Sequence, residues 1–273
     1  MAINPGYMGV VEVAGQQIKV NDCSIVAKQD VQIPDLVMGH FDHLVGAAGK
    51  VEIGGGCSGP MTENFGSGLW AAAYNRTSDC GLLTVGDVKV FYFCNGNTRT
   101  FHGILINTLK LSCAAGEIGQ FSFDVMGAQK PDDTGSITSN KLEEKLLTWD
   151  QFNVTGNIPG IANGIASFEV NINNGCTAYY SLAQADYFPF QIVPGLRTIT
   201  GSVSVYNADL SGGGWDDFAA FSVPATGNIS FNLGAVTINL DKVAFHRPTP
   251  ALGVGPVITT VPFTCIGRLP DTF

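Results

Sequence analysis

The sequence is poor in charged residues. Asp, Glu, Lys and Arg make up 14% of the chain, against roughly 25% in average soluble proteins. The imbalance is acidic, with 23 Asp and Glu against 14 Lys and Arg and a net charge of −9. A chain of this charge is a poor electrostatic partner for nucleic-acid phosphates. Its polar residues are instead Ser, Thr, Asn, Gln and Gly, which suits a surface largely covered by other subunits.

Long apolar runs and cysteine motifs are also missing. No stretch of about 18 apolar residues predicts a transmembrane helix, and the first residues lack the basic start and apolar core of a secretion signal. We therefore expect synthesis in the cytoplasm. Seven cysteines are spaced irregularly, without a CxxC or a Cys/His metal pattern. Buried free thiols are the favoured interpretation, and a disulfide remains the alternative.

Signatures of catalysis are absent as well. The sequence contains no GxSxG, HExxH or GxxxxGK[ST] motif. His40 and His43 flank Asp42 in a predicted loop, which is too few placed ligands for a metal site. The glycine-rich run Gly54–Gly59 has no Lys or Arg nearby to hold phosphate, so a structural turn is the better interpretation. We expect no enzyme activity, no cofactor and no metal.

Acidic residues occur as two adjacent pairs, Asp132-Asp133 and Asp216-Asp217. Neighbouring side chains point to different sides of a strand or a helix, so a general acid and base would not converge there. Solvated charges explain both pairs better.

What the sequence does contain is alternation of apolar and polar residues. In Phe101–Gly127, apolar side chains recur at every second position on both sides of a glycine-containing break. This period of two predicts an antiparallel hairpin with one buried face. The predicted buried positions are Leu105, Leu109, Leu111, Cys113, Phe121, Phe123 and Val125.

The second half of the chain repeats features of the first. FSFDVMG (Phe121–Gly127) aligns with VPFTCIG (Val261–Gly267), and QIKVNDC (Gln17–Cys23) aligns with SFEVNINNGC (Ser167–Cys176), matching Val20 with Val170. The strand Thr198–Tyr206 corresponds to Lys50–Ile53 and its surroundings. We predict two tandem β-domains, 1–130 and 146–273, joined by a linker at 131–145.

Each predicted domain carries one short helix. Thr62 is a candidate N-cap, and Phe65, Leu69 and Ala73 fall on one face of a helix from Glu63 to Tyr74. Trp215, Phe218 and Ala219 indicate the second helix after a glycine run. Lys141–Trp149 is a further possible helix, at the domain boundary.

A long loop, Gln29–Gly49, carries apolar side chains that nothing nearby in sequence covers. They are Leu36, Met38, Phe41 and Leu44. Exposed apolar residues of this kind indicate a contact with another molecule. We predict that this loop contacts a second copy of the chain.

The two-copy pattern resembles the tail tube proteins of bacteriophages. The resemblance rests on the strand ending in Val170–Asn174, the strand Ile199–Tyr206 and the closing strand Pro262–Gly267. In the first half it rests on IKVNDC (Ile18–Cys23), Cys57–Trp70 and Leu111–Gly127. It covers most of both halves.

The resemblance implies a mainly β fold of two tandem β-sandwich or barrel domains whose inner sheets join edge to edge around a lumen. It implies rings of three chains with pseudo-sixfold symmetry, stacked head to tail into the tail tube of the virion. Other tail proteins would bind the tube ends, and DNA would pass through the lumen on its way into the host. The four apolar loop residues would then mediate ring stacking.

Two other functions remain open, both for β-rich virion proteins. One is a tail-tip or baseplate (distal tail) protein, and the other is a receptor-binding or carbohydrate-binding β-sandwich. A carbohydrate-binding protein would present clustered exposed aromatics in loops, whereas most aromatics here alternate within predicted strands.

The acidic composition predicts an electronegative lumen. Duplex DNA carries one charge per about 1.7 Å of its axis, so even a weak attraction per phosphate would sum into a trap. A conduit with few Lys or Arg avoids tight binding. Negative charge on the outside, serving solubility only, is the alternative.

Overall fold

A computed structural model describes 9–32, 47–63, 65, 67–74, 86–92, 97–133, 137, 145–158, 164–183, 186–206, 226–234, 236–246, 249–251 and 257–266. This part of the chain is mainly β, as predicted, with a single α-helix, α1 (Ser67–Tyr74), and a short 3₁₀ helix, Trp149–Gln151. No helix in these segments is long and apolar enough to cross a membrane.

The strands of the first half are β1 (Gly9–Val13), β2 (Gln16–Ile18), β3 (Asp22–Cys23), β4 (Val26–Gln32), β5 (Ala47–Pro60), β6 (Gly86–Tyr92), β7 (Asn97–Ala114) and β8 (Gln120–Gly127). Those of the second half are β9 (Phe152–Gly156), β10 (Ile165–Asn173), β11 (Thr177–Tyr179), β12 (Gln191–Val193), β13 (Thr198–Tyr206), β14 (Thr226–Leu233), β15 (Val236–Phe245), β16 (Thr249–Ala251) and β17 (Ile258–Cys265).

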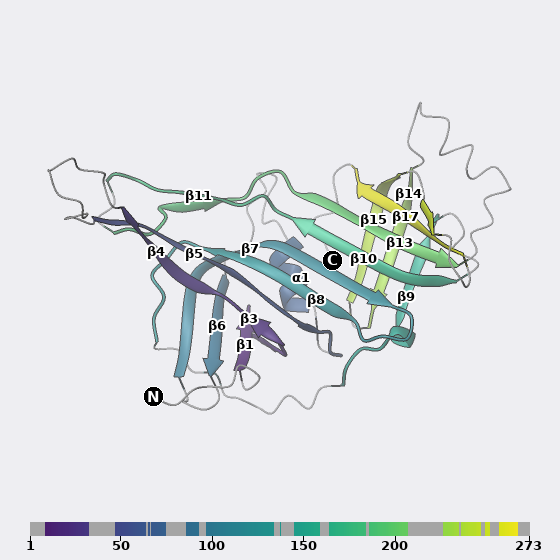
Figure 1. Cartoon of the computed structure of the whole chain (residues 1–273), viewed down its shortest axis with the longest axis horizontal. Coiled ribbons are helices and arrows are strands. Elements are labelled where there is room, and N and C mark those ends of the chain that lie inside the picture. The colour runs from purple at the N-terminus through teal and green to yellow at the C-terminus, as the bar shows by residue number, and fades with distance from the viewer. Residues whose placement is uncertain are drawn as a thin grey trace, which may run out of the picture.

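One long antiparallel sheet connects the two halves. Strands β4, β5, β8, β7, β10, β13 and β17 lie side by side across the molecule (Figure 1). The link between the halves is the pairing of β7 with β10, in which Thr108–Ala114 lies against Ser167–Asn173. We call this pairing the internal junction. The described sheet is open and does not close into a barrel.

The predicted hairpin Phe101–Gly127 is confirmed as β7 and β8. Leu109 lies opposite Phe123 and Leu111 opposite Phe121, and all four side chains are buried. One member of the predicted face is wrong. The register shifts between Ile106 and Thr108, and this β-bulge turns Leu105 to the opposite face, where it packs with Ile192.

The strand pairings of the second half repeat those of the first. In the first half the order is β3/β4, β5, β8, β7, β6, β1, and in the second it is β10, β13, β17, β15, β14, β9. Every neighbouring pair in both series is antiparallel. The predicted match of Phe121 with Val261 aligns Gly59 with Val203, the residues that they pair with in β5 and β13, and we use this alignment to compare the two halves.

The predicted match of Val20 with Val170 does not fit the pairing register. Val170 pairs with Gly201, which in turn pairs with Phe263. The corresponding route in the first half runs from Phe123 through Cys57 to Cys23. Cys23, and not Val20, therefore occupies the place of Val170.

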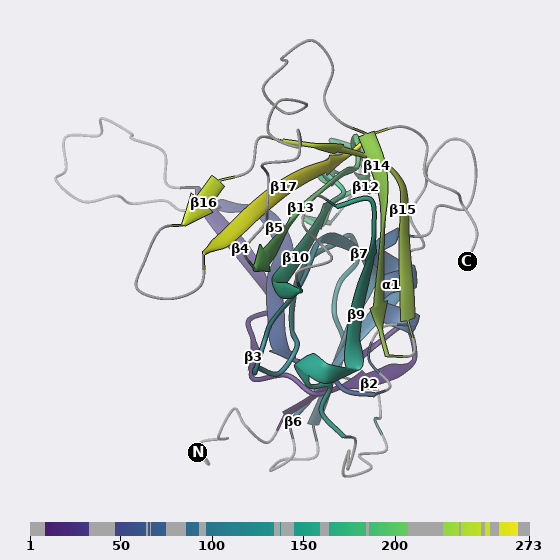
Figure 2. The ribbon, with the colours of Figure 1, turned by 90° about the vertical axis from the view of Figure 1, so that its right-hand side faces the viewer.

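The core lies between two layers. Figure 2 shows β9, β14 and β15 facing β10, β13 and β17 across the second half. Fully buried aromatics such as Phe231 and Phe263 fill the space, with ring centroids 6.0 Å apart. The buried residues of both halves form one continuous apolar cluster, so the two halves share a core along the internal junction.

Helix α1 packs on this cluster through Leu69, Trp70 and Ala73, as its apolar spacing predicted. It begins at Ser67, later than predicted. Thr62 forms a bridge with Leu146 instead of capping the helix, and Glu63 N donates to Lys145 O at 3.0 Å.

The possible helix at Lys141–Trp149 is wrong over its described part. Leu146 and Thr148 form antiparallel bridges with Thr62 and Ile118, which keeps this backbone extended. Only Trp149–Gln151 is helical, in 3₁₀ geometry. The first residues of that segment lie outside the described residues, as do the predicted second helix at Trp215, Phe218 and Ala219 and the loop residues Leu36, Met38, Phe41 and Leu44.

The second half caps the C-terminal end of α1. Asn174 is fully buried, and its Nδ2 donates to Ala73 O and to Ile106 O, both at 2.9 Å. Arg197 donates to Tyr74 O, and its guanidinium lies 4.6 Å from the centre of the Tyr74 ring. The last carbonyls of a helix have no partner within the helix and carry partial negative charge. Asn174 and Arg197 supply donors and a cation there, and this anchors the first half to the second.

We expect Asn174→Ala to lower the free energy of unfolding by about 2–4 kcal/mol, because it leaves two buried carbonyls without a donor. Urea unfolding followed by tryptophan fluorescence measures the change. Asn171→Ala, on the solvent face of the same strand, is the matched control and should stay near the parent chain. An equal loss in both variants would show that the buried amide is not an anchor.

Candidate assembly surfaces

One face of the long sheet is lined by short polar side chains. Because the strands are in register, these side chains form rows that cross the sheet. One row is Asp22, Ser58, Ser122, Lys110, Asn171, Thr200 and Thr264. The next is Gln120, Ser112, Glu169, Ser202 and Pro262. We call this surface the polar face.

The polar face carries more acidic than basic charge. Asp22, Asp124 and Glu169 lie on it, with Lys110 as the cation among them. Lys110 Nζ is 2.9 Å from Glu169 Oε2 across the internal junction, and both side chains are about half exposed. Asp124 accepts from Thr108 Oγ1 at 2.8 Å. The salt bridge neutralises one carboxylate, so the surplus charge is negative.

The sheet ends in an open edge on each side. At one end β3 and β4 pair only with β5, and at the other β16 pairs only with β17 among the described strands. Ser24 N donates to Gly56 O at 2.8 Å. Since backbone N–H groups alternate in direction along a strand, those of Ile25 and Ala27 point away from β5. Unpaired edges of this kind are templates for another strand.

An arm from the second half extends over the first half. It consists of β11, β12 and their connection, and Figure 1 shows β11 running beside the far ends of β4 and β5. Val51 N donates to Tyr187 O at 2.8 Å, and the Tyr180 hydroxyl donates to Val51 O at 3.1 Å. Lys50 Nζ lies 5.7 Å from the centre of the Tyr180 ring. These contacts hold the arm in place.

The arm exposes a group of large apolar side chains, which sequence patterning did not find. Leu182 is fully exposed, and Tyr179, Tyr187 and Phe190 are more than half exposed; Leu196, just after β12, is also largely exposed. The signal in the sequence that could have indicated this surface is the cluster of aromatic residues between Tyr179 and Phe190, which does not alternate with polar residues as in a half-buried strand. A patch of this kind marks a surface that another molecule covers.

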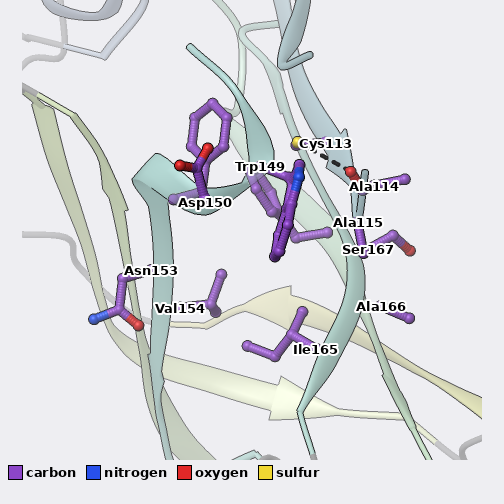
Figure 3. Close-up of a pocket in the computed structure, with 12 residues that line it drawn as sticks. Cys113, Ala114, Ala115, Trp149, Asp150, Asn153, Val154, Ile165, Ala166 and Ser167 are labelled. Atoms are coloured by element: carbon purple, nitrogen blue, oxygen red, sulfur yellow. Dashed lines mark hydrogen bonds between the residues drawn. The ribbon is translucent and has the colours of Figure 1, made fainter. Parts of the chain in front are cut away.

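A cavity of about 340 Å³ opens where β9 and β10 approach the end of β7. Figure 3 shows Trp149, Val154 and Ile165 around the opening, with Asp150 and Asn153 at its side. Cys113 also lines the cavity, and burial, with Glu117 close by, raises the pKa of its thiol to about 11, so the thiol is protonated near neutral pH. The lining suits an apolar contact and not catalysis.

The ionisable side chains outside this cavity include a histidine held between two carboxylates. Among the described residues no group of three or more His, Cys, Asp or Glu is placed to hold a metal. His102 lies between Asp132, at 3.0 Å, and Asp87, at 3.2 Å. Burial of the ring opposes the charged form, but hydrogen bonds to Asp132 and Asp87 outweigh it and raise the pKa of His102. His40 and His43, which the sequence analysis judged too few for a metal site, lie outside the described residues.

Polar rows on one sheet face, the open ends of the long sheet at β3/β4 and at β16, and an apolar arm are the features of the described residues that suit contact with other proteins. Comparison with protein families agrees, since the model of the phage tail tube protein family matches residues 11–267. The chain belongs to this family of phage tail tube proteins. It is a structural protein of the bacteriophage virion, located in the tail. A search of curated proteins found no match.

Membership of this family implies self-assembly into a tube together with other tail proteins. The four loop residues predicted to contact a second copy of the chain lie outside the described residues. They are Leu36, Met38, Phe41 and Leu44. The strands that carry their loop, β4 and β5, are described and pair as far as Gln32 and Ala47.

Proposed function

We propose that three chains close into a ring with pseudo-sixfold symmetry, and that rings stack head to tail into a tube through which DNA passes. The observation that carries this proposal is the internal junction. If the halves are two tube domains, divided near 131–145 as the sequence predicts, β7 and β10 already join two domains edge to edge. Three such chains supply six domains.

The two open edges correspond to the two sides of the internal junction. β16 occupies the place of the end of β7, since Thr249 pairs with Thr260 of β17 as Ser112 pairs with Gln120 of β8. β3 and β4 occupy the place of β10, because they pair with β5 as β10 pairs with β13. Joining β16 of one chain to β3 and β4 of the next would repeat the junction between chains.

Repeating the junction also sets the register between chains. Ser112 lies opposite Glu169 in the internal junction. Their counterparts are Thr249 and Asp22, which would face each other across the boundary between neighbours. By the same register, the outward backbone groups of Ile25 and Ala27 would lie opposite His246 and the end of β15, which precede β16 in the chain.

The polar face would line the lumen. Supporting this, the core side of the same sheet is already covered by β1, β6, β9, β14 and β15. The polar face has no large apolar side chain in its two rows, and the carboxylates of Asp22, Glu52, Asp124 and Glu169 outnumber the lysines Lys28 and Lys110 on the same face. DNA would therefore pass without tight binding, since each attractive phosphate contact adds to a salt-dependent hold on the whole duplex.

A second function has a specific observation in its favour. The exposed aromatics Tyr179, Tyr187 and Phe190 gather on the arm, as expected of a carbohydrate-binding or receptor-binding surface at the tail tip. The family match favours a tube subunit, in which the arm would contact neighbouring subunits.

We expect the assembled ring to have the mass of three 28.8 kDa chains, measured by native mass spectrometry or by symmetry analysis of electron micrographs. Ala27→Pro, which removes an outward N–H of the open edge, should weaken assembly by about tenfold or more. Ala27→Gly keeps that N–H and is the matched control. A ring of six chains, or normal assembly of folded Ala27→Pro, would contradict the proposed closure.

Deletion of Val37–Leu44 should leave a folded subunit that no longer forms tubes, because it removes apolar residues of the proposed stacking loop. The loop base at Gln32 and Ala47 is untouched, so strand register should survive. Circular dichroism checks folding, and negative-stain microscopy checks for tubes. Replacing Leu36, Met38, Phe41 and Leu44 by Ser tests the side chains without shortening the loop. Tubes of normal length in both variants would show that stacking lies elsewhere, with the arm as the next candidate.

Assembled tubes should release duplex DNA at physiological salt, as measured by co-sedimentation. Glu169→Lys with Asp124→Lys should raise retention and make it fall steeply with added salt. The same change at exposed Asp150 and Asp241, away from the polar face, is the matched control. Equal retention by the two double variants would place the lumen on a different surface.

A further inference from the structure

Two cysteines face each other across the edge of the sheet. Cys23 of β3 lies directly opposite Cys57 of β5, and their Sγ atoms are 2.6 Å apart. The neighbouring pair is hydrogen-bonded, with Ser24 N donating to Gly56 O. Cys23 and Cys57 therefore form a non-hydrogen-bonded pair, in which opposing Cα atoms are about 4.5 Å apart. That spacing lies within the range of disulfides, about 4.4–6.8 Å.

We propose that Cys23 and Cys57 are a site of reversible oxidation, at which a disulfide joins the edge strand β3 to β5. The proposal concerns the single subunit and does not depend on the proposed ring.

The two thiols are unequal, as a reactive pair requires. Cys57 is buried, with 2% of its surface exposed, and its thiol donates to Cys23 Sγ. That hydrogen bond lowers the pKa of Cys23 and raises the pKa of Cys57. Cys23 is partly exposed. The more accessible sulfur, of Cys23, is thus the more readily deprotonated one. The buried sulfur of Cys57 is placed to attack a mixed disulfide formed on Cys23.

The oxidant is a low-molecular-weight disulfide such as glutathione disulfide. The Cys23 thiolate attacks one of its sulfurs, which forms a mixed disulfide and releases one glutathione thiolate. Cys57 gives its proton to the solvent or to the leaving thiolate and attacks Cys23 Sγ, which releases the second glutathione. Two protein thiols are oxidised, and one small disulfide is reduced to two thiols.

The position of the pair gives the bond a structural effect. β3 has only two residues and is held on one side, by β5. A bond between residues 34 apart in sequence closes a loop that the unfolded chain would leave open, which stabilises the folded state. Oxidation would therefore fix an edge strand that is otherwise held by few hydrogen bonds.

Other described thiols are placed differently. Cys113 Sγ donates to Ala114 O and Glu117 O, and Cys265 Sγ donates to Lys242 O. Burial raises the pKa of Cys265 to about 11, as it does for Cys113. These two thiols face carbonyls and should remain reduced under mild oxidation.

The test incubates the full chain with excess glutathione disulfide, blocks remaining thiols with iodoacetamide, and maps disulfides by tryptic mass spectrometry. Trypsin can cut between the two cysteines at Lys28 and Lys50. We expect a peptide pair linked through Cys23 and Cys57 as the main product, reversed by dithiothreitol. Cleavage at Lys28 under native conditions should also slow by about tenfold or more on oxidation, because opening of the edge becomes less frequent.

Cys57→Ala should stop at the mixed disulfide on Cys23, while Cys23→Ala should take up little glutathione. Cys113→Ala is the matched control and should form the Cys23–Cys57 bond normally. The unmodified chain decides the matter even if a variant fails to fold. Persistent glutathione on Cys23 in that chain, or bonds spread evenly over other cysteines, would overturn the proposal.

Discussion

The pairing of β7 with β10 is the contact on which the rest of the structure depends. A strand has two edges, and the long strand β7 uses its edges for three partners. Its first part pairs with β6, and its later part pairs with β8 on one side and β10 on the other. This division is possible because β7 changes direction where Gly103 adopts a φ of 61°, a conformation that costs glycine little. The β-bulge after Ile106 then resets which face is buried.

The internal junction explains why one face of the sheet is polar while the other is apolar. Pairing β7 with β10 joins the inner strands of the two halves into one sheet, while β1 and β6 in one half and β9, β14 and β15 in the other stay in separate outer layers. The core side is covered by those outer layers, so the apolar positions of β7, β8, β10 and β13 are buried there. The opposite side has no covering layer along its rows. Short Ser, Thr and Asn side chains suit that position because they need no partner beyond water or one another, as Ser204 and Thr260 show at 3.0 Å.

Sequence patterning was most successful where burial alternates strictly. The hairpin of β7 and β8 and the apolar stripe of α1 both follow from spacing, because tertiary packing there reinforces the local pattern.

Sequence patterning failed where a single residue alters the strand register. Asn107, the extra residue of the β-bulge, has no distinctive neighbours, so Leu105 was assigned to the wrong face. The start of α1 was misplaced because Thr62, a good N-cap by type, pairs with Leu146 from a distant segment. Sequence patterning does not predict the arm for a similar reason. Tyr180 and Tyr187 are positioned by hydrogen bonds to Val51 of the distant strand β5, and the sequence around them does not alternate between apolar and polar residues. Family membership was predictable from the repeated motifs, whereas the positions of the open edges required the strand order.

The two edges that the proposed ring would join differ from the internal junction in one respect. At the internal junction β7 is continuous and offers a full set of backbone donors. At the corresponding open edge the strand is reduced to Thr249–Ala251 and contains Pro250, which has no N–H. The residue that would face it, the counterpart of Phe168, is Asn21, and Asn21 N already donates to Ser58 O at 2.7 Å. A short edge with a proline is a common protection against premature pairing.

Within the proposed assembly, the covalently linked junction would form as the chain folds. The junction between chains would be weaker, so it would depend on the arm, the loop after β4 and the neighbouring ring for its stability. That ordering suits a subunit that must remain separate until a growing tube supplies all of these contacts together.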